Sequence, residues 1–155
     1  MPTWGYSVKE FDPDRAVECS GRELKISPKA ATELCRSLRG MRLDSAKELL
    51  EDVMKKKRAI AFRRYDKKVP HKSLDEGWYA GRYPVKAAKT FLFLLEELEA
   101  NAEYKGLDVD RLRIVHAASQ RGMKTQRVVS RAYGRATAYQ NTMVHIELMG
   151  YEVAE

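Results

Sequence analysis

Apolar residues recur every three or four positions in three segments of the chain, as they do along the buried face of an amphipathic helix. We therefore predict helices over residues 28–39, 44–58 and 84–105. The third helix, bounded by Pro84 and Gly106, has the longest stripe and is expected to form the centre of the core. The stripes are Ala31, Leu34, Cys35 and Leu38; Ala46, Leu49, Leu50, Val53 and Met54; and Val85, Ala88, Phe91, Leu92, Leu95, Leu98 and Ala102.

Local signals mark the ends of the first two helices. Ser27 is placed to cap the first helix, and Pro28 suits its first turn because proline lacks the N–H that would be unpaired there. Gly40 can end the same helix. Asp44 is the expected cap of the second helix, and the cations of residues 55–58 close it, where positive charge suits the helix dipole.

An alternating pattern predicts strands elsewhere. Residues 16–26 are expected to be extended. Two further segments alternate, one with Leu112, Ile114, His116 and Ala118 on one face and one with Thr142, Val144, Ile146 and Leu148. Because they bracket a basic segment, we predict an antiparallel hairpin with its tip near Gly134, where glycine eases a tight reversal. Ten residues beyond the body would project that tip by roughly 30 Å.

The remaining segments lack a clear period. Residues 1–14 form an irregular lead-in, residues 59–62 a short apolar piece, and residues 63–83 a long loop whose aromatic residues indicate function rather than disorder. We expect one domain covering residues 1–155, with a body of about 15–112 and 142–150 and a hairpin arm of about 113–141.

The position of the charge is more informative than its size. The net charge is +7, and the segment from Arg111 to Gln140 holds seven Lys and Arg and no Asp or Glu. Over the rest of the chain, 22 basic residues match 22 acidic ones. A confined excess of this kind favours a polyanionic partner, above all a nucleic acid, over a merely solvated face.

The arm has the side chains that bind folded RNA. Arginine's planar fork pairs with phosphate and stacks on bases. Tyr133 and Tyr139 can stack on unpaired bases or pack across the strands, and the sequence is compatible with both interpretations. Double-stranded DNA fits less well, because no helix-turn-helix or zinc finger is evident and the basic excess avoids the predicted helices.

The evidence for an enzyme is weaker. His71 lies near Asp75 and could act as a base oriented by an acid. His116 and His145 fall on opposite strands of the hairpin, and a structural role is favoured because no third metal ligand is evident. Cys19 and Cys35 have no metal-ligand spacing, which favours packed thiols in a reduced protein. No phosphate-binding motif, secretory signal or membrane-length apolar run is present in the sequence.

The segment "SRAYGRATAYQNTMVHIEL" resembles the signature of the large-subunit ribosomal protein twenty-two family, called protein seventeen in eukaryotes. Its core is Arg131, Ala132, Gly134 and Arg135, followed by His145, Ile146 and Leu148. The segment "GWYAGRYPVKAAKTFLFLLEELEANAEYKGLD" and the preceding "HKS" resemble the archaeal and eukaryotic branch. Many relatives have proline where this chain has Ser130. The end at Glu155, without the long eukaryotic tail, favours an archaeal source.

The resemblance implies an α+β fold, with three helices packed on a small antiparallel sheet and a long protruding hairpin. It implies a structural protein of the large ribosomal subunit in the cytoplasm, which binds large-subunit ribosomal RNA, supports assembly and lines the nascent-polypeptide exit tunnel with its hairpin. The expected partners are that RNA, neighbouring ribosomal proteins and the nascent chain. No cofactor, metal, membrane or homo-oligomer is expected.

Two groups of RNA-binding residues follow from the charge pattern and the resemblance. The first group is Arg111, Arg113, Arg121, Lys124, Arg127, Arg131, Tyr133, Gly134, Arg135 and Tyr139. The second is His71, Lys72, Trp78 and Arg82. Ordering of a mobile arm on RNA is the expected mechanism. The alternatives are an RNA-acting enzyme that uses His71 and Asp75, a non-ribosomal RNA-binding module, and a protein-interaction module whose hairpin adds a strand to a partner's sheet.

Overall fold

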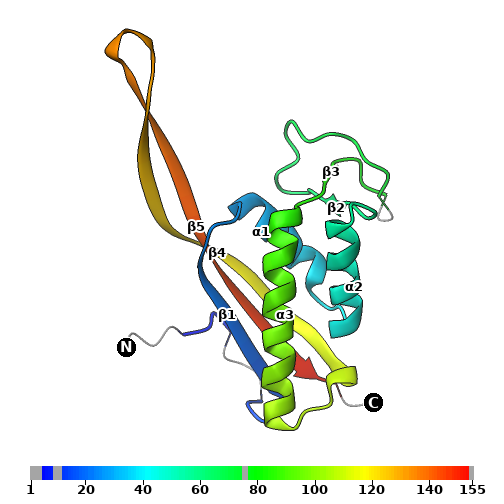
Figure 1. Ribbon diagram of the computed structural model, residues 1–155. Helices are drawn as coiled ribbons and strands as arrows, with labels where there is room; N and C mark the ends of the chain where they lie inside the picture. Colours follow the sequence, from blue (N-terminus) through cyan, green and yellow to red (C-terminus); the bar gives the residue numbers. More distant parts are fainter. Residues whose placement is uncertain (1–4, 9–11, 75–76, 154–155) are drawn as a thin grey trace.

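A three-stranded antiparallel sheet forms one layer of the body and three helices form the other (Figure 1). The computed structural model describes residues 5–8, 12–74 and 77–153. The sheet has the order β1 (Ala16–Leu24), β5 (Ala136–Glu152) and β4 (Leu112–Ser130). This arrangement confirms the α+β class and the protruding β4–β5 hairpin.

The helices α1 (Pro28–Leu38), α2 (Leu43–Met54) and α3 (Val85–Lys105) place their apolar stripes against the sheet and one another. As predicted, Phe91, Leu95 and Leu98 of α3 are fully buried at the centre of this core. Gly106 follows α3 with a φ of 74° and ends it in the left-handed conformation that glycine adopts without strain.

Two details of the predicted helix starts differ from the structure. Ser27 occupies the cap position of α1, but its side chain makes no capping hydrogen bond. The second helix begins at Leu43 with Arg42 as its cap residue, so the predicted cap at Asp44 was wrong. Asp44 instead lies inside the first turn, where its negative charge still favours the positive end of the helix dipole.

A β-bulge changes which residues of β4 face the core. The pairing of β4 with β5 shifts register between Ile114 and His116. One extra residue on a strand moves every later side chain to the other face. Leu112 and Ile114 are buried as predicted, but the next buried residue is Ala117. The prediction that His116 shares their face was therefore wrong, as it was for Ala118.

The long loop after α2 is held to the body by a buried carboxylate. The Oε1 atom of Glu33 accepts hydrogen bonds from the backbone N–H groups of Arg64 at 2.9 Å and Tyr65 at 3.1 Å. Two short strands, β2 (Ile60–Ala61) and β3 (Gly81–Arg82), pair and close the loop at its base. The segment between them is thereby fixed beside the start of α3.

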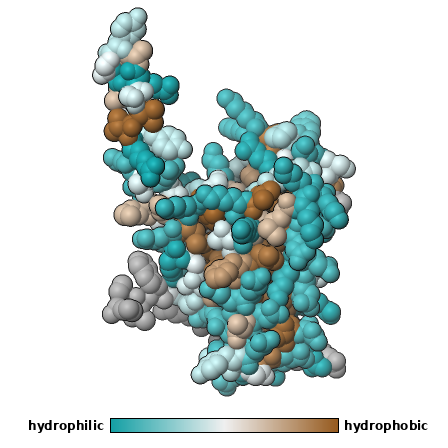
Figure 2. Space-filling model, viewed as in Figure 1, coloured by the Kyte–Doolittle hydropathy of each residue, from teal (hydrophilic) through white to brown (hydrophobic). Residues whose placement is uncertain are grey.

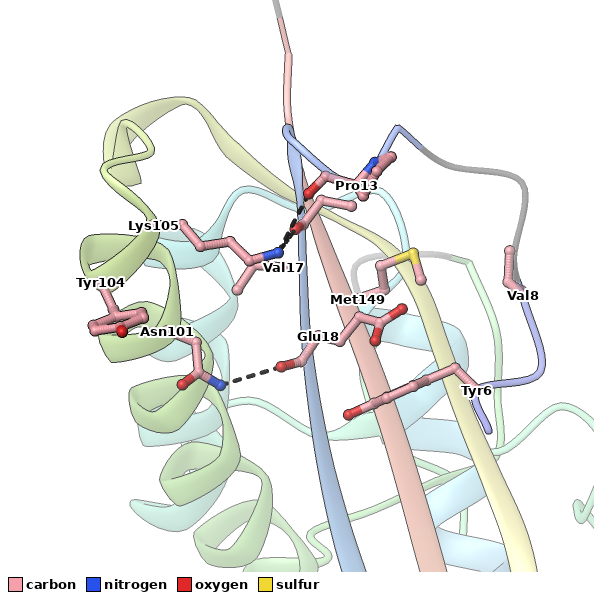
Figure 3. Close-up of a pocket in the computed structure, with 10 residues that line it drawn as sticks. Tyr6, Val8, Pro13, Val17, Glu18, Asn101, Tyr104, Lys105 and Met149 are labelled. Atoms are coloured by element: carbon pink, nitrogen blue, oxygen red, sulfur yellow. Dashed lines mark hydrogen bonds between the residues drawn. The ribbon is translucent and has the colours of Figure 1, made fainter. Parts of the chain in front are cut away.

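Both free edges of the sheet are covered within the body. On the β1 edge, Asn101 donates to the carbonyl oxygen of Glu18, and the Nζ of Lys105 donates to that of Ala16, beside a cavity of about 670 Å³ (Figure 3). On the β4 edge, Ile114 exchanges backbone hydrogen bonds with residues 40 and 41. Covered edges resist pairing with another chain, so these parts of the sheet are poor sites for strand addition.

Candidate RNA interface

The β4–β5 hairpin leaves the body where β1 stops pairing with it. The last β1 pair joins Leu24 to Val144, and Val144 is itself opposite Arg121. Beyond that level β4 and β5 pair only with each other, as far as Ser130 and Ala136. All residues from 126 to 141 are exposed, and the ribbon extends away from the body (Figure 1). We call residues 121–143 the arm.

The pairing register divides the arm into two faces. Residues directly opposite each other in an antiparallel pair project on the same face, and neighbours along a strand alternate. Arg127 therefore shares a face with its partner Tyr139, together with the pair Thr125 and Asn141. The other face has Lys124, opposite Thr142, and three further pairs: Gln126 with Gln140, Val128 with Ala138, and Ser130 with Ala136. Both faces thus present polar or cationic groups to solvent.

The cations along the arm keep their charge open to a partner. There are five cations from the root of the arm to its tip, and all are exposed: Arg121, Lys124, Arg127, Arg131 and Arg135. Within the described part of the chain, none of the five forms an ion pair with a carboxylate. By contrast, Lys55 of the body pairs with Glu51 at 2.7 Å. Uncompensated guanidinium groups on a thin ribbon suit an external polyanion.

A tight reversal closes the arm at its tip. Tyr133 and Gly134 both adopt positive φ, 57° and 66° respectively, and Arg131 donates its backbone N–H to the carbonyl oxygen of Arg135 at 2.8 Å. The tip therefore lies where Gly134 predicted it. The side chain of Tyr133 is fully exposed and that of Tyr139 is 53% exposed. Neither ring is buried in cross-strand packing, so both are available for stacking.

Two of the arginines predicted to bind RNA lie outside the arm. Arg111 belongs to a short 3₁₀ turn at the start of β4, and its Nε is 3.2 Å from the Oδ2 of Asp108. Arg113 is paired with Tyr151 of β5 and bridged to Arg42 before α2. Arg111 precedes β4 and Arg113 is its second residue, so both lie at the end of the hairpin opposite the tip. Figure 1 shows the two ends of the β4–β5 hairpin. The structure therefore separates them from the five cations of the arm.

The second group of predicted RNA-binding residues lies together in the loop between β2 and β3 and in β3 itself. Trp78 donates its indole N–H to the carbonyl oxygen of Phe62 and stacks on Tyr79 with ring centroids 4.9 Å apart. His71 meets the edge of Tyr79. Arg82 donates to the carbonyl oxygen of Lys68, and the remaining member, Lys72, lies over the ring of Tyr83. Trp78 thus anchors the loop, while the charged members stay at its surface.

The segment from the C-terminal end of α2 to β3, which includes this loop, is also more basic than the chain-wide sum suggested. Between Lys55 and Arg82 the sequence has ten Lys and Arg against three Asp and Glu. All ten are exposed: Lys55, Lys56, Lys57, Arg58, Arg63, Arg64, Lys67, Lys68, Lys72 and Arg82. The acids that balance them in the total lie mainly elsewhere, including four on α3. A windowed charge count would have found this second basic surface.

The histidines of the hairpin do not form a joint site. His116 is opposite Met149, whereas His145 is opposite Gln120. The Nε2 of His116 is 3.0 Å from the Oγ of Ser7, and the Nδ1 of His145 accepts the backbone N–H of Glu23. Among the described residues, no group of three or more His, Cys, Asp and Glu is placed to hold a metal.

The structure supports the packed-thiol interpretation of the cysteines. Cys19 and Cys35 are buried free thiols, and burial raises the pKa of each to about 12. Asp75, the acid proposed to orient His71, lies outside the described residues. No helix in the described part of the chain has the length and apolar character needed to span a membrane.

Comparison with known proteins identifies the family. The model of the family described as "Ribosomal protein L22p/L17e" matches residues 19–150. The chain belongs to the ribosomal protein L22p/L17e family. It is 50% identical to the large ribosomal subunit protein uL22 of Methanopyrus kandleri over 149 residues, 94% of each chain. It is 51% identical to that of Archaeoglobus fulgidus over 96% of each, and 46% identical to that of Thermofilum pendens over 99% of each.

These matches confirm the resemblance drawn from the sequence motifs. The range covered by the L22p/L17e model includes the whole arm and the basic loop between β2 and β3. The relatives named above are all archaeal, in line with the expected archaeal source. The roles of individual arm residues remain predictions.

Proposed function

We propose that this chain is a structural, non-enzymatic component of the large ribosomal subunit in the cytoplasm, and that it binds large-subunit ribosomal RNA through its arm. The observation that carries the proposal is the solvent-exposed ribbon whose five cations lack carboxylate partners within the described part of the chain. Membership of the L22p/L17e family gives the RNA its identity. The relatives in M. kandleri and A. fulgidus are named as large-subunit proteins.

The mechanism is phosphate neutralisation along both faces of the ribbon. Each guanidinium or ammonium group that meets a phosphate releases a condensed counterion, which makes binding strongly dependent on salt. Arg127 on one face and Lys124 on the other allow RNA to surround the arm. Small residues between the cations, such as Ser130, Ala136 and Ala138, keep the ribbon thin enough to pass between RNA helices.

The tip is the part proposed to line the nascent-polypeptide exit tunnel. Its narrow two-strand shape and the exposed ring of Tyr133 suit a surface that borders a channel. Neighbouring ribosomal proteins and the nascent chain are the remaining proposed partners. The basic loop between β2 and β3 is proposed to contact a second stretch of the same RNA, which would let one protein join two RNA regions during assembly.

The RNA-acting enzyme is the less favoured alternative. His71 makes an edge contact with Tyr79 and a β-bridge to Ala80, and these contacts give it a structural role in the loop. A ribosomal protein family also predicts a structural role. If His71→Ala abolished turnover of an RNA substrate while RNA affinity was retained, the enzyme would be favoured instead.

The salt dependence of RNA binding tests the proposal. The probe is large-subunit ribosomal RNA transcribed from the A. fulgidus gene, titrated at several salt concentrations. The triple variant Arg127→Ala, Arg131→Ala, Arg135→Ala should bind more weakly and lower the slope of log K against log salt by about two to three, roughly one per lost phosphate contact. A matched control replaces three exposed body cations, Arg15, Arg36 and Lys89, by alanine. Equal slopes for the arm variant and the unaltered chain would overturn the proposal.

A further inference from the structure

A groove of about 1060 Å³ lies where the arm joins the body. Three segments that are distant in the sequence form its walls: residues 25–30 at the start of α1, residues 83–87 at the start of α3, and the root of the arm. Figure 2 shows apolar surface at the level where the arm meets the body. The volume is at the upper end of the range for ligand pockets, so the groove has room for more than one planar group.

The rim of this groove has positive charge without a balancing acid. Lys25, Lys86 and Arg127 line it, one from each wall, and all three are exposed. None of its lining residues, among those the structure describes, is Asp or Glu. The N-terminal ends of α1 and α3 also border it and add a weaker positive potential. The electrostatics therefore select an anionic occupant.

The walls between these cations are aromatic, apolar and amide-bearing. Ile26 and Ala87 are buried at the groove, and Tyr83 and Tyr139 contribute rings. Gln140 and Asn141 add amides that can pair with the edges of bases. Planar rings, amides and spaced cations are what unpaired nucleotides require, since bases stack, base edges form hydrogen bonds and phosphates pair with cations. A neutral lipid or an apolar peptide would leave the three cations without partners.

The register of the arm explains why its residues reach this groove. Arg127 and Tyr139 are directly opposite each other, as are Thr125 and Asn141, and all four line the groove. That face of the arm borders the groove through both of its strands. From the opposite face only the β5 residues Gln140 and Thr142 line the groove, and their β4 partners Gln126 and Lys124 do not.

We propose that this groove binds an unpaired segment of ribosomal RNA, with a base stacked on Tyr139 and phosphates held by Lys25, Lys86 and Arg127. The inference rests on the proposed function and adds a site to it. RNA held here contacts the arm and the body at once, so binding would fix the direction in which the arm leaves the body.

A double variant of the groove lysines is compared with a lysine variant outside the groove. Lys25→Ala with Lys86→Ala should lower the salt slope for A. fulgidus large-subunit RNA by about two. Lys89→Ala removes an exposed cation three residues along α3 that does not line the groove, and should change the slope by less than one. All three side chains are exposed, so the variants should melt at the temperature of the unaltered chain. Ultraviolet crosslinking of the complex should attach nucleotides to the tryptic peptide Tyr83–Lys86.

The outcomes separate the groove from the wider proposal. In one outcome the arm triple variant loses salt dependence, the groove variant behaves as Lys89→Ala does, and no nucleotide is attached to residues 83–86. That outcome overturns the groove assignment and leaves the RNA-binding arm in place. If the arm variant is also unaffected, both fail. If polyglutamate binds the chain through Lys25 and Lys86 while RNA binding ignores them, the groove belongs to an acidic protein segment instead.

Discussion

Gly122 lies against the imidazole of His145 at the point where the arm leaves the body. A Cβ atom at Gly122 would be 2.7 Å from the Nε2 of His145 and 3.0 Å from its Cε1. The ring cannot easily withdraw, because its Nδ1 accepts the backbone N–H of Glu23 at 3.0 Å. Gly122 also falls within the register shift between Arg121 and Lys124. The root of the arm therefore has no room for a side chain at residue 122.

We expect Gly122→Ala to lower the free energy of unfolding by about 1–3 kcal/mol, the usual cost of forcing an extra methyl group into a packed site. His145→Ala should remove the obstacle, so that the double variant is more stable than the sum of the single effects predicts. Chemical denaturation of the four proteins measures this coupling. Purely additive losses would show that the contact is not the cause.

Amide exchange should distinguish the arm from the body. Beyond Arg121 and Val144 the β4–β5 ribbon lacks the support of β1, and two strands exposed on both faces are marginally stable in water. In the free protein we expect the amides of residues 125–140 to exchange faster than those of residues 146–149 in the sheet. Binding of ribosomal RNA should slow them. Equal protection of both regions in the free chain would contradict a mobile arm.

The buried Glu33 is expected to hold the basic loop in place. It is 1% exposed, its Oε1 accepts the N–H groups of Arg64 and Tyr65, and its Oε2 has no hydrogen-bond partner in the described structure. Glu33→Ala would leave two N–H groups unpaired, at a cost of about 1–3 kcal/mol for each one that stays buried. Glu33→Gln retains an acceptor and should lose less.

Loop exchange and thermal unfolding together check the prediction for Glu33. The amides of Arg64 and Tyr65 should exchange faster in Glu33→Ala than in Glu33→Gln. Thr32→Ala, a neighbour on α1 whose hydroxyl donates to the carbonyl oxygen of Pro28, serves as the control and should leave these two amides unchanged. If the alanine and glutamine variants matched, the hydrogen bonds to Oε1 would not be what secures the loop.

Much of the fold is encoded in local patterns that the sequence displays directly. The stripe through Phe91 and Leu95 predicts α3, and the alternation through Val144 and Ile146 predicts β5, because each period reflects one buried face. Gly134 marks the tip, since the reversal needs positive φ. Such features depend on neighbours along the chain.

Two of the misses depend on contacts between distant segments. The bulge before His116 arises in the pairing of β4 with β5, and no single-strand pattern reports it. The groove joins Lys25, Lys86 and Arg127, which lie in three separate parts of the sequence, so only the tertiary structure brings them together. The second basic surface was visible in the sequence, but a chain-wide sum concealed it because the acids of α3 balanced its charge.

His116 should make stability depend on pH near neutrality. Burial lowers the pKa of His116 below its ordinary value of 6.5, and the nearby Arg39 lowers it further, while Glu147 acts in the opposite direction. The folded state thus favours the neutral ring, which lies 3.0 Å from the Oγ of Ser7. The unfolded chain takes up this proton at a higher pH than the folded chain does.

As the pH falls, the unfolded state binds this proton before the folded state does. The contribution of His116 to the free energy of unfolding is therefore fully present above about pH 6.5. It is lost as the pH falls below that value and through the pKa of His116 in the folded state. We expect the free energy of unfolding to decrease between pH 7.5 and pH 5.5, and to decrease less in His116→Gln. His71→Gln, a change in the exposed loop, is the control and should keep the full decrease. Denaturant titrations at the two pH values measure the difference. An identical decrease in the unaltered chain and His116→Gln would assign the pH dependence to other groups.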